Sequence, residues 1–174
     1  MNNLFFTGEI QVGKSTLLRK LLKKRGLRPG GAETGFGPWR AEESRRLFLH
    51  PYGKPDYSEG SVCARMEPEG KIVYPAVFDG RGAALVRAAV NDPEVDVVIL
   101  DELGFLEAEA AGFRAAVLDI LTGPKPVLGV VRQGLGVWQD APLGEVWEVT
   151  GENRDAVPAL LRQRLGPLFP AAFR

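Results

Sequence analysis

The sequence predicts an α/β fold in which helices cover both faces of a mainly parallel β-sheet. Apolar runs of strand length alternate along the chain with segments that repeat apolar residues at helical spacing. The run at 95–100 is nearly unbroken in its apolar character, which is typical of a central parallel strand buried on both faces. We detect no internal repeat, and expect residues 1–174 to form a single domain.

The first predicted elements are a strand at 4–6 and a helix that begins near Ser15. A glycine-bounded loop joins the two. Four apolar residues fall on one face of the helix: Leu17, Leu18, Leu21 and Leu22. Basic residues gather in its last turn, where the helix dipole favours them, and Gly26 is a suitable end.

Residues 28–76 interrupt this regularity with frequent glycines and prolines. We expect irregular strands and loops added to the core, as part of the same domain, including extra β-hairpin elements within 30–76. Strand-like segments occur at 46–49, 62–66 and 71–74. The last two flank Glu67-Pro68-Glu69-Gly70, which is typical of a hairpin turn.

The alternation of strands and helices resumes at Asp79, which we expect to cap a helix. This helix would carry Leu85, Val86, Ala89 and Val90 on one face. A second helix is predicted from about Glu107 to Gly123-Pro124, where it stops. Strands are predicted at 126–131 and 145–149. A final helix would bear Val157, Leu160, Leu161 and Leu165.

Composition and charge exclude several classes of function. Lys plus Arg and Asp plus Glu number 22 each, so the net charge is zero. General nucleic-acid binders and polybasic membrane anchors both need a surplus of positive charge, so we expect neither partner. With one cysteine and one histidine, neither an internal disulfide nor a protein-built zinc site is expected. Because no signal peptide or membrane-spanning run is evident, we expect a cytoplasmic protein.

One motif carries chemistry that can be specified. Residues 8–15 fit the phosphate-binding pattern G-x-x-x-x-G-K-[ST], and Thr16 follows them. Glycines at these positions let successive backbone N–H groups surround a polyphosphate at a helix N-terminus. We expect Lys14 to reach the β- and γ-phosphates and Ser15 to ligate Mg²⁺. The predicted binding residues are Gly8, Glu9, Ile10, Gln11, Val12, Gly13, Lys14, Ser15 and Thr16.

Two carboxylates follow the apolar run at 97–100. Asp101 stands at the carboxyl end of the predicted strand, where ligands of parallel sheets bind, so it is the predicted second Mg²⁺ ligand. Glu102 comes next and could activate a water for attack on the γ-phosphate. Hydrolysis needs such a base, whereas phosphate binding alone does not.

Together these motifs resemble the THEP1 family of small P-loop nucleoside-triphosphatases, which includes the human cancer-related nucleoside-triphosphatase. Besides the phosphate loop, 101–107 is similar to the family's D-E-hydrophobic-G-x-x-E, and 149–155 to its V-T-x-E-N-R. The resemblance spans nearly the whole chain and is weakest in the middle. It implies a RecA-like, three-layer P-loop NTPase fold and Mg²⁺-dependent hydrolysis of nucleoside triphosphates, with loose base preference.

The sequence also departs from the family pattern. Glu9, Ile10 and Gln11 occupy loop positions that usually hold small residues. The family's G-F-Y-T-x-E-x-R stretch is present only as the first two residues of 35–40, and Phe105 stands where lysine is common. These departures concern turnover and substrate choice more than nucleotide binding.

Three further residues are weaker candidates. Arg132 ends a predicted strand, where it could stabilise charge on the γ-phosphate or form a surface salt bridge. Asn153 and Arg154 lie in the C-terminal motif and could contact the nucleotide, although Asn153 could instead cap the last helix. The charged group at Arg40, Arg45 and Arg46 is interpreted as a solvated face.

The sequence therefore predicts a Mg²⁺-dependent nucleoside-triphosphatase that acts on ATP, GTP and other triphosphates. Its catalytic residues would be Lys14, Glu102 and Arg132. Two alternatives share the same core: a nucleotide or small-molecule kinase, which needs an acceptor pocket that excludes water, and a non-catalytic nucleotide-binding adapter. No N-K-x-D or T-K-x-D tetrapeptide is present, so guanine-specific recognition of the small-GTPase type is not supported.

Overall fold

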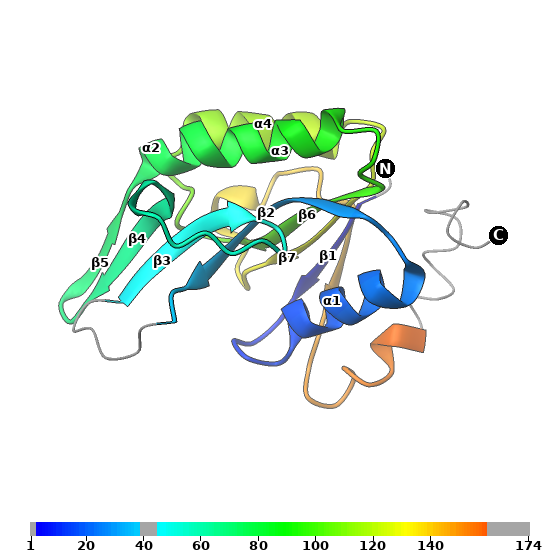
Figure 1. Ribbon diagram of the computed structural model, residues 1–174. Helices are drawn as coiled ribbons and strands as arrows, with labels where there is room; N and C mark the ends of the chain where they lie inside the picture. The colour runs from blue at the N-terminus through cyan, green and yellow to red at the C-terminus, as the bar shows by residue number, and fades with distance from the viewer. Residues whose placement is uncertain (1–2, 39–44, 160–174) are drawn as a thin grey trace.

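A computed structural model of the protein describes residues 3–38 and 45–159. Its strands form one sheet in the order β5-β4-β3-β2-β6-β7-β1-β8 (Figure 1). Five strands run parallel: β1 (Asn3–Thr7), β2 (Pro29–Phe36), β6 (Val97–Leu103), β7 (Val127–Val131) and β8 (Glu145–Glu148). Three continue the sheet antiparallel from β2: β3 (Arg45–Pro51), β4 (Val62–Glu67) and β5 (Gly70–Val73). The predicted α/β class and its extra hairpin are confirmed.

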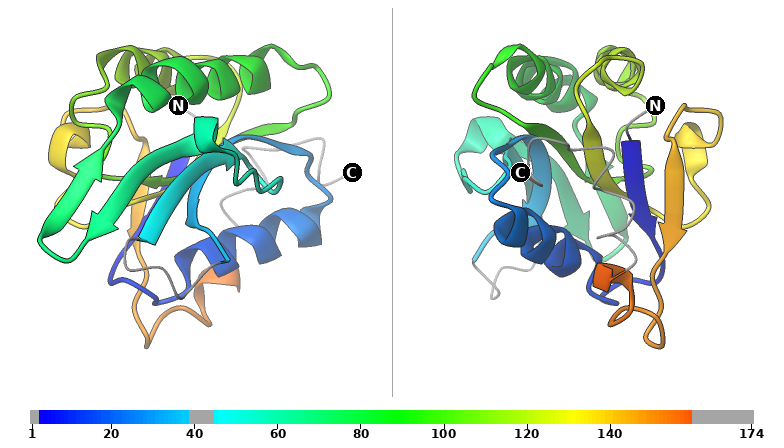
Figure 2. Two further views of the ribbon diagram at one scale, coloured as in Figure 1. Left: turned by 60° about the vertical axis from the view of Figure 1, so that its left-hand side comes forward. Right: turned by 90° about the vertical axis from the view of Figure 1, so that its right-hand side faces the viewer.

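Helices lie on both faces of the sheet, as Figures 1 and 2 show. Helix α1 (Lys14–Arg25) covers one face, and α3 (Ala83–Asn91) and α4 (Ala111–Leu121) cover the other. Side chains alternate between the two resulting cores, so that Leu4 and Phe6 of β1 pack with the leucines of α1 while Phe5 packs on the opposite side. This is the expected three-layer sandwich.

The strand order places the functional segments at one edge. β7 separates β1 from β6, and all three are parallel, so their carboxyl ends meet at the same edge. The 8–13 loop leaves β1 at this edge and α1 begins there. Asp101 and Glu102 lie in the second half of β6. Residues far apart in the sequence are thereby brought together.

The sequence analysis missed β2, which is a central strand and not an irregular segment. Gly30 and Gly31 have low strand propensity, but both are required by close packing. A Cβ on Gly31, whose φ is +117°, would lie 2.1 Å from the carbonyl oxygen of Ile99 on β6. A Cβ on Gly30 would lie 2.8 Å from the side chain of Val95. The glycines that suggested a loop allow two backbones to approach.

The predicted cap at Asp79 was assigned to the wrong helix. The chain is already helical at Pro75–Val77 (α2) and passes through a π-helical turn at Phe78–Gly82 directly into α3, so Asp79 lies inside this helical run. Its Oδ1 accepts a hydrogen bond of 2.9 Å from the backbone N–H of Phe113, in the first turn of α4. Asp79 therefore caps α4, which begins at Ala111 and not near Glu107.

The other predicted elements follow the sequence closely. The expected hairpin pairs Glu67 with Gly70 between β4 and β5. α1 ends at Gly26, whose left-handed backbone caps it as anticipated. Of the final predicted helix, only Val157 and its two successors are described, and the remainder lies outside the described residues. Within the part of the chain that the structure describes, no helix is long and apolar enough to span a bilayer.

Candidate active site

The 8–13 loop has the backbone of a phosphate cradle. Gly8, Gln11 and Gly13 all have positive φ, at 135°, 66° and 103°. A Cβ on Gly8 would lie 2.2 Å from the carbonyl oxygen of Val149, so only glycine fits between the loop and the segment after β8. Ile10 is exposed at the tip. The predicted order of strand, glycine loop and helix is confirmed.

Lys14 bends back across this loop. Its Nζ donates hydrogen bonds to the carbonyl oxygens of Gly8 at 2.9 Å and Glu9 at 2.6 Å. Burial lowers the pKa of Lys14, although the nearby carboxylates of Glu102 and Asp101 oppose this shift. The ammonium group is thus held against the loop that would surround a polyphosphate.

Ser15 and Asp101 are joined directly. The Ser15 Oγ donates a hydrogen bond of 2.8 Å to Asp101 Oδ1, across 86 positions of sequence. Asp101 is 8% exposed, and burial raises its pKa to about 6. A hydroxyl and a carboxylate are hard oxygen donors of the kind that Mg²⁺ prefers. The described residues contain no cluster of three His, Cys, Asp or Glu side chains suited to a metal. Ser15 and Asp101 fit Mg²⁺ as two oxygen ligands, because protein-bound Mg²⁺ usually keeps waters and substrate phosphates as its others.

A network of polar side chains beside this pair was not found from the sequence. Glu33 of β2 lies beside Asp101 in the parallel register and is 6% exposed. Its carboxylate accepts hydrogen bonds from the guanidinium of Arg19 at 3.2 Å and from the N–H of Gly53 at 3.0 Å. Arg19 is one helical turn beyond Ser15, and this spacing is the only sequence signal that links the network to the site. The network connects α1 to β2 next to Asp101.

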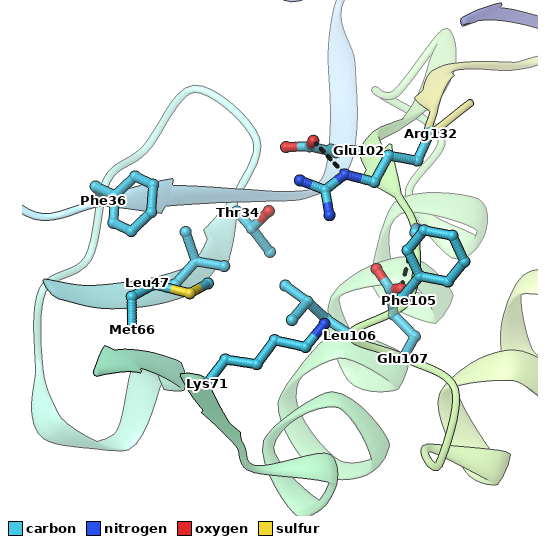
Figure 3. Close-up of a pocket in the computed structure, with 11 residues that line it drawn as sticks. Thr34, Phe36, Leu47, Met66, Lys71, Glu102, Phe105, Leu106, Glu107 and Arg132 are labelled. Atoms are coloured by element: carbon cyan, nitrogen blue, oxygen red, sulfur yellow. Dashed lines mark hydrogen bonds and ion pairs between the residues drawn. The ribbon is translucent and has the colours of Figure 1, made fainter. Parts of the chain in front are cut away.

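Glu102 and Arg132 are also brought together. The pairing of β6 with β7 is irregular between Leu100 and Leu103, and Glu102 has a φ of +74°. The side chain of Glu102 is therefore half exposed whereas that of Asp101 is buried. Glu102 Oε1 lies 3.6 Å from Arg132 Nε at the carboxyl edge of the sheet (Figure 3).

Glu107 shapes the turn that follows. Its Oε2 accepts a hydrogen bond of 3.0 Å from the N–H of Gly104, and the residue is only 2% exposed. Burial raises the pKa of Glu107 to about 7. The sequence analysis placed this residue in a motif without giving it a role, and the structure shows that it anchors the segment after Glu102.

The C-terminal motif forms a turn near α1. The Asn153 side chain accepts a hydrogen bond of 2.9 Å from the Thr150 N–H and donates one of 2.9 Å to the Glu148 carbonyl. Its amide is thus engaged within its own turn. Arg154 lines a cavity of about 450 Å³ with Gln11, Val12, Gly13, Thr16 and Lys20. A nucleotide contact by Asn153 or Arg154 stays a prediction, and Arg40 lies outside the described residues.

Comparison with known proteins gives a consistent result. A model of the NTPase family matches residues 3–161. The nucleoside-triphosphatase THEP1 of Ignicoccus hospitalis is 32% identical over 76% of each chain. The nucleoside-triphosphatase THEP1 of Thermococcus kodakarensis is 28% identical over 93% of each chain. These relatives match over most of their length.

Two solved structures share the fold. The crystal structure of THEP1 from Aquifex aeolicus superposes with a TM-score of 0.61 at 23% identity, over 95% of this chain and 99% of that one. The solution structure of a human cancer-related nucleoside triphosphatase gives a TM-score of 0.62 at 21% identity, over 95% and 97%. At such identities the superpositions are evidence for the fold alone.

Proposed function

The chain belongs to the THEP1 family of nucleoside-triphosphatases, and from this premise we propose that it cleaves the β–γ phosphate bond of a nucleoside triphosphate with a water activated by Glu102. The observation that carries the proposal is the divergence of two neighbouring carboxylates. Asp101 turns inward and is bonded to Ser15, while Glu102 turns outward and lies beside Arg132. One carboxylate is thus placed to serve a metal and the other to serve a nucleophile.

The phosphates would lie in the 8–13 loop, with backbone N–H groups and the start of α1 directed at them. Lys14 would exchange its two carbonyl partners for phosphate oxygens, since both bonds are to the loop that surrounds them. Ser15 and Asp101 would hold Mg²⁺, which when bound neutralises charge on the β- and γ-phosphates. Arg154 borders the cavity next to the loop and would contact the nucleoside.

In the hydrolytic step, Glu102 accepts a proton from the attacking water as the water oxygen bonds to the γ-phosphorus. The bond from that phosphorus to the bridging oxygen breaks, and the nucleoside diphosphate leaves with the electron pair. Lys14 and Arg132 both carry positive charge near Glu102, so each can oppose charge that develops on the transferred group. The positive φ of Glu102, in a region that is unusual outside glycine and often found at active sites, supports this role.

The test is phosphate release by Glu102→Gln with Mg²⁺ and each of ATP, GTP, CTP and UTP. Loss of a general base should lower turnover by about 10²–10⁴-fold while nucleotide affinity is retained. Glu109→Gln, a substitution at an exposed residue past the same strand, is the matched control. Wild-type turnover by Glu102→Gln would contradict the assignment of the base. A protein that binds nucleotide tightly and releases no phosphate would instead be an adapter.

A further inference from the structure

A second cavity is bordered by the Glu102–Arg132 pair. It encloses about 200 Å³ between the antiparallel strands and the turn after β6 (Figure 3). Its walls are largely apolar: Phe36, Leu47, Met66, Phe105 and Leu106. Phe36 and Phe105 are among the few large apolar residues that remain exposed. A pocket of this character favours a small organic ligand over water.

The charges of this cavity lie on two sides of the apolar walls. Glu102 and Arg132 form one end, and Lys71 of β5 extends across the cavity toward Leu106 (Figure 3). The buried carboxyl group of Glu107 also lines the cavity, and burial raises its pKa to about 7. Among the described residues Lys71 has no ion-pair partner, whereas Arg132 has Glu102. An occupant would therefore gain most from an anionic group near Lys71. Its opposite end would then lie beside the carboxylate of Glu102.

The Glu102 end of the cavity is also close to the phosphate site. Glu102 directly follows Asp101, whose carboxylate accepts the 2.8 Å hydrogen bond from Ser15 at the end of the phosphate loop, and the charges of Glu102 and Arg132 act on Lys14. The carboxylate proposed to activate the nucleophile thus borders an apolar cavity on one side and the phosphate site on the other. That is the arrangement which a phosphotransferase requires, because its acceptor must displace water from the position of attack.

We propose that this cavity is an acceptor pocket, in which the protein binds a small alcohol with an apolar body and a remote carboxylate, and phosphorylates its hydroxyl group. The proposal rests on the role of Glu102 given above and adds a second substrate to the same site. The acceptor carboxylate pairs with Lys71, its body packs against Leu47 and Met66, and its hydroxyl group reaches Glu102.

The transfer balances without any further reactant. The acceptor hydroxyl gives its proton to the Glu102 carboxylate as its oxygen bonds to the γ-phosphorus. The bond between that phosphorus and the bridging oxygen breaks, and the nucleoside diphosphate takes the electron pair. The products are a phosphate monoester and a nucleoside diphosphate, and the Glu102 proton is then released to water.

The probe is para-hydroxymethylbenzoate, whose hydroxyl and carboxylate lie at opposite ends of an aromatic ring. The full-length protein is incubated with Mg-ATP and this probe, and phosphorus NMR distinguishes inorganic phosphate from a benzylic phosphate monoester. We expect the ester from para-hydroxymethylbenzoate and none from para-toluate, which lacks the hydroxyl group. Glu102→Gln should abolish ester formation. Free phosphate is also measured in parallel samples that lack the probe, and that signal tests the hydrolase separately.

A binding measurement gives a second readout that is independent of activity. Ligand-observed NMR with para-toluate reports occupancy in the presence of ADP. We expect Lys71→Gln to weaken this binding about two- to fivefold, the loss of one solvent-exposed charge pair. Lys54→Gln, at an exposed lysine outside the cavity, should leave it unchanged. Circular dichroism verifies that both variants are folded.

Each outcome decides the question. Ester formation together with Lys71-dependent binding supports the acceptor pocket. Absence of binding at millimolar probe concentration, or binding that Lys71→Gln leaves intact, overturns it. Binding without ester, in a protein that still releases phosphate, overturns the acceptor role and leaves the hydrolase standing. Ester formation in a protein that releases no phosphate without the probe supports the pocket and removes hydrolysis as the function.

Discussion

Replacing Glu107 with glutamine should remove a pH dependence from the stability of the protein. Burial raises the pKa of this carboxyl group from its usual 4.5 to about 7, so the folded state prefers the protonated form. The unfolded chain binds fewer protons than the folded chain between these two values. The contribution of this group to stability is therefore largest below its unfolded pKa of 4.5 and is lost progressively as the pH rises to about 7.

The size of the effect follows from the two pKa values. Below 4.5 the group is protonated in both states and contributes no pH dependence. Each pH unit between the two values costs about 1.4 kcal/mol, and the loss levels off above the higher one. From about pH 5 to about pH 8 the free energy of unfolding should fall by about 2.5 kcal/mol through this group alone. Glutamine retains the amide-accepting oxygen that Gly104 uses but does not ionise.

The assay is urea unfolding of wild type and Glu107→Gln at both pH values. Other carboxyl groups, including Asp101, change the two proteins equally, so the difference between them isolates Glu107. The variant should gain about 2.5 kcal/mol relative to wild type on going from about pH 5 to about pH 8. A difference that stays constant with pH would refute the raised pKa. Glu109→Gln, exposed in the same turn region, should track wild type.

Three further predictions concern packing, capping and the metal. Gly31→Ala should lower the free energy of unfolding by about 3 kcal/mol or more in the same denaturation assay, because the added Cβ would overlap the backbone of β6. Gly60→Ala, at a residue with open space around it, should have little effect. Asp79→Ala should lower the free energy of unfolding by about 1 kcal/mol, because it removes the cap of α4. Asp119→Ala is the control, and equal stabilities of the two variants would contradict the capping role. Ser15→Ala should raise the Mg²⁺ concentration needed for half-maximal phosphate release, and an unchanged requirement would exclude Ser15 as a ligand.

The parts of the fold that could be predicted from sequence are those encoded locally. The phosphate loop has a fixed spacing of residues, and the leucines of α1 follow one helical face, so both are legible without tertiary information. The apolar run that leads to Asp101 is equally clear. Ser15 and Asp101 could be paired in advance because carboxyl ends of parallel strands converge.

The features that were missed depend on contacts between distant segments. β2 was not recognised because Gly31 is dictated by the backbone of β6, and no local pattern reports that contact. Asp79 looked like a cap for its own helix, since the sequence does not show that α4 packs beside it. The hydrogen bond between Arg19 and Glu33 and the burial of Glu107 likewise arise only when the sheet is assembled.

The bond between Ser15 and Asp101 has a thermodynamic consequence for the whole molecule. This hydrogen bond joins α1 to β6 through two residues that are 86 positions apart in the sequence, so the pair exists only when the sheet is complete. A ligand that requires both residues binds the native state and not the unfolded one, and it raises stability in proportion to the logarithm of its free concentration. The melting temperature of this protein should thus rise with the concentration of any ligand that this pair holds, and protein from which the ligand has been removed should unfold at the lowest temperature.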